Sequence, residues 1–305
     1  MADDCTIRPA TEADWPAIAA LSDVVMGGAL PLELMRWKHQ ANPFGASAVL
    51  VAEDDQGLVG MRTMARWELR AGGETLRAVR PVDTMTHPRF RRRGLFRRLT
   101  TRMVDDMRDE GVDLIFNTPN EKSGAGYLKM GWQSVGRLAV WARPTSPLGR
   151  TDGHPVDGAG FPLAQGRHRR LHTPHSAAYI DWRYGRAPGL DYQAYGDAEV
   201  GLIARRRARG ERQELTISEI SCPATPGGIA RAAALLHRAA HRSAGTYALA
   251  MAAPGTRQAA ALALAGFAWV PGRGPWLVAR PLSSRADWAL QRGWWRPQIG
   301  DLEVF

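Results

Sequence analysis

The stretch "DTMTHPRFRRRGLFRRL", residues 83–99, decides the fold. It begins as an extended segment, passes through a loop that contains Pro88, and continues after Gly94 as a helical pattern. The start of a helix presents unpaired backbone N–H groups and the positive end of the helix dipole. Arginines beside it add bidentate hydrogen bonds to phosphate oxygens. We therefore interpret this strand–loop–helix junction as a site for a compact phosphate group.

The pattern on both sides of the loop predicts a mixed α/β fold. Apolar residues four apart form one stripe of the helix that we expect over 94–110: Leu95, Leu99, Met103 and Met107. Before the loop we expect a strand near 5–10, a helix over 11–25 and successive strands between 47 and 85. After the helix we expect a strand at 112–118, a helix at 121–131 and a strand at 138–144.

The chain repeats itself at domain size. Residues 32–45 resemble residues 177–190, and residues 131–144 resemble residues 266–281, in the same order along the chain. A repeat this long indicates duplication of a domain, because solenoid repeats are much shorter. We expect a first domain at 1–145, a linker rich in Gly and Pro at 146–166, and a second domain at 167–305.

The stretch around the loop resembles the GNAT superfamily of acyl-CoA-dependent N-acyltransferases. Arg91–Phe96 matches the family motif R/Q-x-x-G-x-G/A, except that Phe96 stands where the family has Gly or Ala. The preceding "THPRF" is similar to the family's usual lead-in. Asn120, Tyr127 and the pair Gly131–Trp132 follow with the family's spacing.

The opening "TIRPATEADWPAI" is also a common GNAT start, and together these features cover about residues 6 to 144. The resemblance implies two tandem GNAT-like domains of the α/β (α+β) class. Each would have a mixed, mostly antiparallel sheet flanked by helices. It also implies that the two central strands of the sheet splay apart and hold the acyl group of acetyl-CoA between them.

The resemblance further implies an acetyl-CoA-dependent N-acetyltransferase that needs no metal. The residues expected to bind the cofactor are Met85, Thr86, Arg91, Arg92, Arg93, Gly94, Leu95, Phe96, Arg97 and Asn120. Tyr127 would protonate the leaving thiolate, since a phenol titrates near pH 10 and stays protonated at neutral pH. Asp83 is the candidate general base, with Glu68 in reserve. The acceptor would be a primary amine of a small molecule, such as an amino sugar, an amino acid or a specialised metabolite.

The second half lacks this machinery. When Gly228 is aligned with Gly94, Thr225 falls at the position of the lead arginine and Ile217 at that of Asp83. Leu262 falls at the position of the tyrosine. We therefore interpret the second half as a degenerate GNAT-like domain.

Other interpretations of single residues stay open. Asp83 is also suited to cap a turn as a structural carboxylate, and Asn120 to cap its helix. His168, His172 and His175 have no cysteine or acidic residue beside them in the sequence, so we interpret them as surface histidines rather than metal ligands.

Composition limits the partners. There are 40 Lys and Arg against 30 Asp and Glu, a net charge of +10, and such a surface attracts polyanions of any kind. Nucleic-acid binding is one alternative; a CoA-binding pseudoenzyme or regulatory module and a peptide or protein N-acetyltransferase are others. We expect no nucleic-acid or membrane partner and a monomer or homodimer. With two distant cysteines, no signal-peptide pattern and no apolar run of about 18 residues, we expect a cytoplasmic protein.

Overall fold

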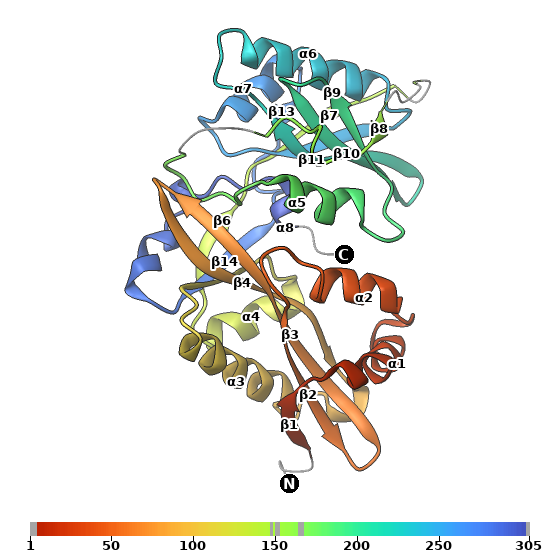
Figure 1. Ribbon diagram of the computed structural model, residues 1–305, viewed down its shortest axis with the longest axis vertical. Helices are drawn as coiled ribbons and strands as arrows, with labels where there is room; N and C mark the ends of the chain where they lie inside the picture. Colours follow the sequence, from red (N-terminus) through yellow and green to blue (C-terminus); the bar gives the residue numbers. More distant parts are fainter. Residues whose placement is uncertain (1–4, 147–148, 150–152, 164–167, 303–305) are drawn as a thin grey trace. The chain divides into compact units, whose positions relative to one another are not determined.

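The computed structural model describes residues 5–146, 149, 153–163 and 168–302 (Figure 1). The chain divides into two compact units, neither of which is one continuous segment. The first unit comprises Met1–Glu68, Leu76–Ser134 and Val278–Leu290, and the second comprises Leu69–Thr75, Val135–Leu277 and Gln291–Phe305.

The first unit is built on a seven-stranded sheet of order β1-β2-β3-β4-β5-β14-β6. Its strands are β1 (Thr6–Pro9), β2 (Ala48–Asp54), β3 (Gly57–Ala71), β4 (Glu74–Thr86), β5 (Leu114–Asn117), β6 (Gln133–Arg137) and β14 (Trp276–Pro281). Strand β2 runs antiparallel to β1 and β3, whereas β4 and β5 are parallel. A parallel pair needs a crossover connection, and α3 (Leu95–Asp109) supplies it.

Helices cover this sheet in two groups (Figure 1). On one side lie α1 (Trp15–Met26) and α2 (Leu32–His39), and on the other lie α3 and α4 (Glu121–Lys129). A short 3-10 turn, η1 (Glu12–Asp14), precedes α1 and begins with a capping box of Thr11 and Asp14. The core under α1 and α2 consists of Trp15, Ile18, Leu21, Met35, Val51, Met61 and Met85.

The second unit repeats the plan with the order β13-β7-β12-β11-β10-β9-β8. Its strands are β7 (Val140–Pro144), β8 (His154–Pro155), β9 (Tyr192–Gly196), β10 (Gly201–Arg209), β11 (Arg212–Ser221), β12 (Tyr247–Met251) and β13 (Ala268–Trp269). Its helices are α5 (Ala177–Ile180), α6 (Gly228–His241), α7 (Arg257–Leu264) and α8 (Ile299–Leu302). The short turns are η2 (Pro88–Phe90) in the first unit and η3 (Asp181–Gly185), η4 (Ser284–Leu290) and η5 (Arg292–Trp294) later in the chain. The predicted fold class, with two mixed sheets and flanking helices, is confirmed.

Each sheet takes one strand from the other half of the sequence. Strand β14, near the C-terminal end, pairs with β5 from Val278↔Asn117 to Pro281↔Leu114. Strand β7, at the end of the first half, pairs with β12 and β13. These are the two closing strands of the internal repeat, so the repeat is present but its last strands are exchanged. The segment predicted as a linker contains β8, which pairs with β9, and part of it lies outside the described residues. The domain boundaries at 145 and 167 stay a prediction.

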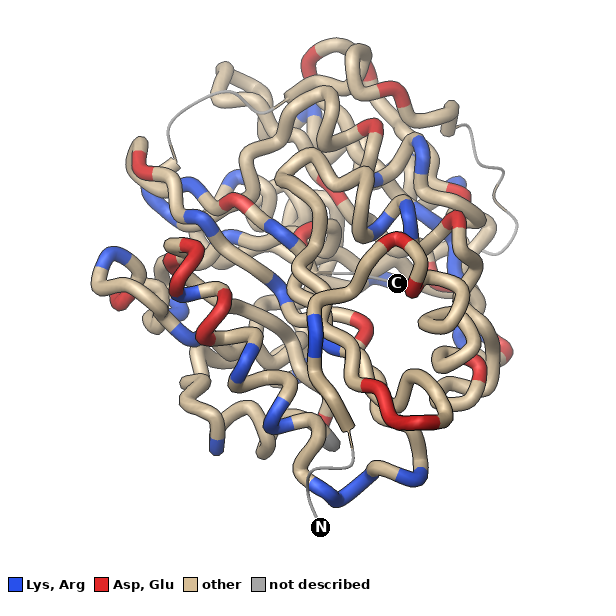
Figure 2. Tube along the Cα trace, turned by 60° about the horizontal axis from the view of Figure 1, so that its bottom comes forward, with Lys and Arg blue, Asp and Glu red and all other residues tan. Residues whose placement is uncertain are grey.

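Charge and hydropathy agree with a folded α/β chain. Lys and Arg, blue in Figure 2, and Asp and Glu, red, occur along elements of both units. Among the residues that the structure describes, no helix combines the length and apolar character needed to cross a membrane. Cys5 and Cys222 are both buried free thiols.

The fit of α3 on β3 can be tested at Gly60. The Cβ of an alanine there would lie 2.9 Å from Cδ2 of Leu95 and 3.1 Å from Cδ1 of Leu99. We expect Gly60→Ala to lower the free energy of unfolding by about 1–3 kcal/mol, as overpacking does. Urea unfolding measures this. Gly28→Ala is the matched control, because a Cβ at Gly28 meets nothing within 4 Å. Equal stability of the two variants would contradict the packing described.

Candidate active site

The two central strands of the first sheet part after a short pairing. Within the described residues, only the pairs Ala78↔Leu114 and Val79↔Ile115 join β4 to β5, although β4 continues to Thr86. Beyond this point β5 stays paired with β14 on its other edge. The rest of β4 therefore offers backbone groups on the edge that faces away from β3, and an extended ligand with amide groups can pair with such an edge.

The loop after β4 has the conformation of an anion site. Arg92 has a φ of +63° and Gly94 a φ of +79°, so two left-handed residues alternate with right-handed or extended ones. The first helical bond of α3 runs from the N–H of Arg98 to the carbonyl of Gly94 at 3.0 Å. The N–H groups before Arg98 therefore lie at the open end of the helix. Alternating handedness turns successive N–H groups to one side and makes a concave anion site.

The three loop arginines are exposed to solvent. The Arg93 guanidinium lies 5.3 Å over the ring of Phe90, which is itself buried. Arg102, which is also exposed and lies further along the helix, is instead tied to Asp106 at 2.7 Å. The loop arginines are thus available to an incoming anion at the point where the backbone N–H groups also converge.

Phe96, the residue that departs from the family motif, turns its ring inward. The ring meets that of Tyr127 edge-on, with centroids 5.7 Å apart at 87°. A Cβ at Gly126 would lie 3.3 Å from Cε1 of Phe96, so the ring packs closely on α4. The larger side chain therefore fills space on the tyrosine side of the helix while its backbone stays in the first turn.

Tyr127 is buried on α4, with 4% of its surface exposed, and its ring also contacts Trp132 at 5.1 Å. Its hydroxyl oxygen accepts a hydrogen bond of 2.9 Å from Nη1 of Arg62 on β3. The same nitrogen donates to the hydroxyl of Thr84 at 2.5 Å. A donor that occupies the phenol oxygen leaves the phenol hydrogen to point elsewhere, toward another acceptor.

Sequence reasoning did not find Arg62. The residue lies within an apolar strand pattern and is fully buried, and its guanidinium stands 5.5 Å over Phe96 and 5.3 Å over Tyr127. Within the described residues its Nε and Nη2 atoms have no hydrogen-bond partner. The only sequence signal is a basic residue inside a buried strand, which is costly and therefore points to a function.

Asp83 lies in β4 with a φ of +43°. Its carboxylate accepts hydrogen bonds from Nζ of Lys38 at 2.8 Å and from Nε2 of His39 at 3.0 Å. The other ring nitrogen of His39, Nδ1, lies 3.0 Å from the hydroxyl of Ser47. Burial raises the pKa of Asp83, but the charge of Lys38 and the bond from His39 outweigh that effect and hold the pKa below its ordinary value. The carboxylate is therefore ionised and a weak base.

The remaining residues singled out in the sequence lie as follows. Met85 is fully buried in the core under α1, and Thr86 is half-buried at the end of β4. Asn120 caps α4, where its Oδ1 accepts from the N–H of Ser123 at 2.9 Å. Glu68 is half-buried on β3. The capping contact uses the side-chain oxygen of Asn120, and its contact with a cofactor stays a prediction.

The second unit has a helix at the corresponding position but lacks the residues that the first unit offers to acetyl-CoA. Gly227, before α6, has a φ of +73°, much like Gly94. Leu262, at the tyrosine position, is fully buried. Strand β11 pairs with β12 over four residues, from Glu214↔Tyr247 to Ile217↔Ala250, twice the extent of the β4–β5 pairing.

The interpretation of His175 as a surface histidine was wrong. Its side chain is 16% exposed, and its Nε2 lies 3.6 Å from a carboxylate oxygen of Glu219 and 3.7 Å from one of Asp301. Both acidic residues are far from it in sequence, so a search for neighbouring acidic residues could not find them.

Comparison with known proteins identifies the fold. The family model for the acetyltransferase (GNAT) domain matches residues 6–135. A search of curated proteins gave no significant match.

Several solved structures resemble nearly the whole chain and show the same fold. A probable N-acyltransferase from Enterococcus faecalis V583 is 15% identical with a TM-score of 0.64, over 91% of this chain and 73% of that one. Eis1 from Mycobacterium abscessus is 16% identical with a TM-score of 0.60, over 94% and 76%. A GCN5-related N-acetyltransferase from Kribbella flavida is 16% identical with a TM-score of 0.63, over 95% and 74%.

The contacts of Asp83 predict a pH-dependent loss of stability in Asp83→Asn. Removing one partner of a buried ion pair costs about 3–5 kcal/mol, so we expect a loss of this order at neutral pH. Because the pKa of Asp83 is lowered in the folded state, its stabilisation is present above the unfolded pKa of about 4 and is lost as the pH falls through the folded value.

Urea unfolding of wild type and variant at several pH values measures this difference, which should narrow below about pH 4. Asp105→Asn is the control, since Asp105 forms an exposed pair with Arg108 at 2.8 Å and such pairs contribute about 0–1 kcal/mol. A loss for Asp83→Asn no larger than that of the control would show that the buried ion pair is not formed.

Proposed function

Because residues 6–135 form a GNAT acetyltransferase domain, and the chain is thus an acyltransferase, we propose that it transfers the acetyl group of acetyl-CoA directly to a primary amine of a small molecule. The observation that carries the proposal is the buried Arg62–Tyr127 hydrogen bond, which lies one strand away from the parting of β4 and β5. The other features of the first unit supply what such a reaction needs.

The cofactor would bind along β4 and its loop. The free edge of β4 at Met85 and Thr86 would pair with the pantetheine amides. The backbone N–H groups from Arg92 to Arg97 would bind the diphosphate, with help from the exposed arginines of the loop. The two left-handed residues of the loop support this assignment, because they give the N–H groups a common direction.

In the reaction, the amine nitrogen attacks the thioester carbonyl and forms the new C–N bond. The C–S bond breaks, and the CoA sulfur leaves as a thiolate. Tyr127 gives its phenol proton to that sulfur, and Arg62 stabilises the negative charge that develops on the phenol oxygen. The attacking nitrogen releases one proton to water as it becomes an amide, and a proton from water restores the phenol. The direction of the Arg62 hydrogen bond supports this role, because it leaves the phenol hydrogen for the sulfur.

The amine must be neutral to attack. The sequence offered Asp83 as the base, but its lowered pKa and its bonds to Lys38 and His39 disfavour proton uptake. We assign Asp83 instead to holding Lys38 and His39 in place beside the end of β4. The amine then loses its proton to water before or during binding, or to Glu68, the second candidate. Under this assignment the rate rises with pH toward the pKa of the amine.

Tyr127→Phe tests the acid. Phenylalanine keeps the ring contacts with Phe96 and Trp132 and removes only the hydroxyl. We expect kcat to fall by about 10²-fold or more, as for loss of a general acid, with little change in KM for acetyl-CoA. Steady-state assays that detect free thiol over a panel of small amines and peptides measure it.

Tyr195→Phe in the second unit is the matched control, because it removes a buried tyrosine hydroxyl outside this site. Near-full kcat in Tyr127→Phe would reject the acid role. Turnover only with peptides would move the acceptor to that class, and acetyl-CoA binding without any turnover would indicate a pseudoenzyme.

The phosphate loop is tested by the double variant Arg91→Ala/Arg93→Ala. Charge-assisted hydrogen bonds contribute about 1.5–3 kcal/mol, so we expect a loss of at least about tenfold in acetyl-CoA affinity by titration calorimetry. Arg102→Ala is the control on the same helix, since its guanidinium already pairs with Asp106. An equal loss in both would indicate a diffuse charge effect rather than a bound phosphate.

A further inference from the structure

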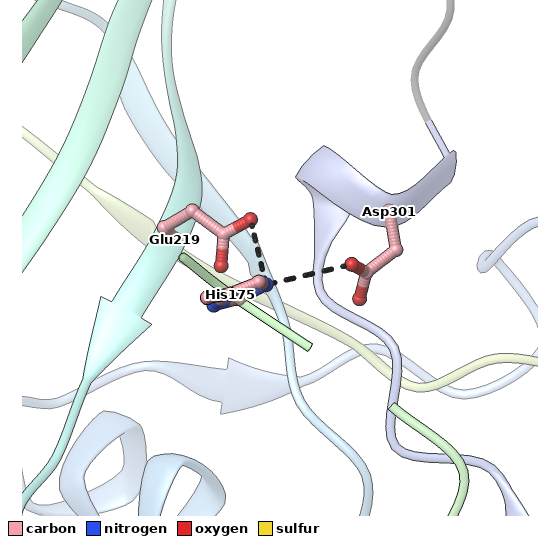
Figure 3. A group of neighbouring side chains, drawn as sticks. All are labelled: His175, Glu219 and Asp301. Atoms are coloured by element: carbon pink, nitrogen blue, oxygen red, sulfur yellow. Dashed lines mark ion pairs between the residues drawn. The ribbon is translucent and has the colours of Figure 1, made fainter. Parts of the chain in front are cut away.

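Three side chains of the second unit converge from distant parts of the sequence (Figure 3). His175 precedes α5, Glu219 lies on β11, and Asp301 lies on α8. Nε2 of His175 is 3.6 Å from Oε1 of Glu219 and 3.7 Å from Oδ1 of Asp301. The three ligand-type atoms all lie within 4.8 Å of one another. The imidazole thus points between two carboxylates.

These distances exceed those of hydrogen bonds. A nitrogen and an oxygen that share a proton lie about 2.7–3.2 Å apart. Nε2 of His175 is buried and has no hydrogen-bond partner in the described part of the chain. The Glu219 side chain is only 1% exposed and that of Asp301 only 5%. A buried nitrogen that faces two buried carboxylate oxygens without a hydrogen bond to either leaves room for an ion between the three atoms.

The surroundings hold the carboxylates in this orientation. Gln298 donates from its side-chain Nε2 to Oε2 of Glu219 at 2.6 Å, and from its backbone N–H to Oδ2 of Asp301 at 2.7 Å. The other oxygen of each carboxylate is the one that faces His175. The hydroxyl of Tyr184 donates to Oε1 of Glu219 at 2.6 Å. Metal-binding carboxylates are held by outer hydrogen bonds of this kind.

The imidazole is also fixed. Its ring stacks on Tyr179 with centroids 5.1 Å apart and planes within 3°. Gly300 brings the backbone of α8 close to Glu219, because a Cβ there would overlap the Tyr184 hydroxyl and lie 2.5 Å from Oε1 of Glu219. The three ligand atoms are therefore positioned by packing before any ligand arrives.

We propose that His175, Glu219 and Asp301 bind a divalent transition-metal ion, with Zn²⁺ as the ion to test first. Three atoms with these separations can be reached by one ion at about 2.1–2.4 Å from each, the range of Zn–N and metal–oxygen bonds. One imidazole and two carboxylates suit Zn²⁺, Mn²⁺ and Fe²⁺ better than thiolate-seeking metals.

Three protein ligands leave coordination positions open. The group lines a cavity of about 430 Å³ in the second unit. His168, His172, Gln258 and Arg296 also line it, so its wall is polar. The open positions would be filled by water or by an anionic ligand in this cavity. The proposal does not depend on the acetyl transfer assigned to the first unit.

Equilibrium dialysis of the full chain against Zn²⁺, followed by mass-spectrometric metal analysis, tests the site. We expect one ion per chain in the wild type, its loss in His175→Ala, and an affinity at least tenfold lower in Glu219→Gln and in Asp301→Asn. Thermal unfolding should shift upward with Zn²⁺ in the wild type and not in Glu219→Gln. Circular dichroism of each variant without metal shows whether it folds.

The matched control is His237→Ala. His237 and His241 are exposed on α6 with ring centroids 6.3 Å apart, a pair able to collect metal at the surface. The proposal is overturned if the wild type binds no Zn²⁺, or if binding survives in His175→Ala and Glu219→Gln but disappears in His237→Ala. Should those two variants fail to fold, the visible spectrum of Co²⁺ added to the wild type decides: a spectrum identical to that of aqueous Co²⁺ overturns the proposal.

Discussion

The separation of β4 from β5 after two residue pairs is the constraint on which the first unit depends. A strand edge left without a partner is costly unless something pairs with it. Each strand keeps a partner on its far edge, β3 beside β4 and β14 beside β5, so the unpaired backbone groups are those that face the gap. The edge of β4 that faces the gap leads directly into the arginine loop. The same gap that weakens the sheet thus makes a place where an extended cofactor can complete it.

The two strands that separate lead to the two groups of the proposed reaction, the arginine loop and Tyr127. β4 ends in the loop whose left-handed Arg92 and Gly94 open the first turn of α3, and β5 is followed by α4, which holds Tyr127. The carboxyl ends of two parallel strands lie at the same edge of the sheet. The arginine loop and Tyr127, the phosphate site and the proton donor of the proposed reaction, are therefore brought to one edge by the direction of the strands, and Arg62 reaches the phenol from the adjacent strand.

The local features could be predicted from sequence, and the long-range ones could not. The helix after Gly94 and the strand at 114–117 follow from periodicity and from the motif. Asp83 binds Lys38 across 45 residues, and His175 meets Asp301 across more than a hundred. Such pairs need the finished fold, since neither partner carries a signal of its own. The exchange of β7 and β14 is of the same kind, because both strands have the pattern expected of them and only the pairing differs.

Arg62 shows why a residue that costs stability is informative. A guanidinium at 0% exposure gives up its hydration, and two aromatic faces and two hydroxyl groups return only part of that energy. Within the described residues its Nε and Nη2 remain without hydrogen bonds. An apolar side chain would pack at this position at lower cost, as replacement of buried charges often shows. In the proposed reaction the charge of Arg62 acts when the oxygen of Tyr127 becomes negative, because a low-dielectric site strengthens that attraction and needs no reorganisation to provide it.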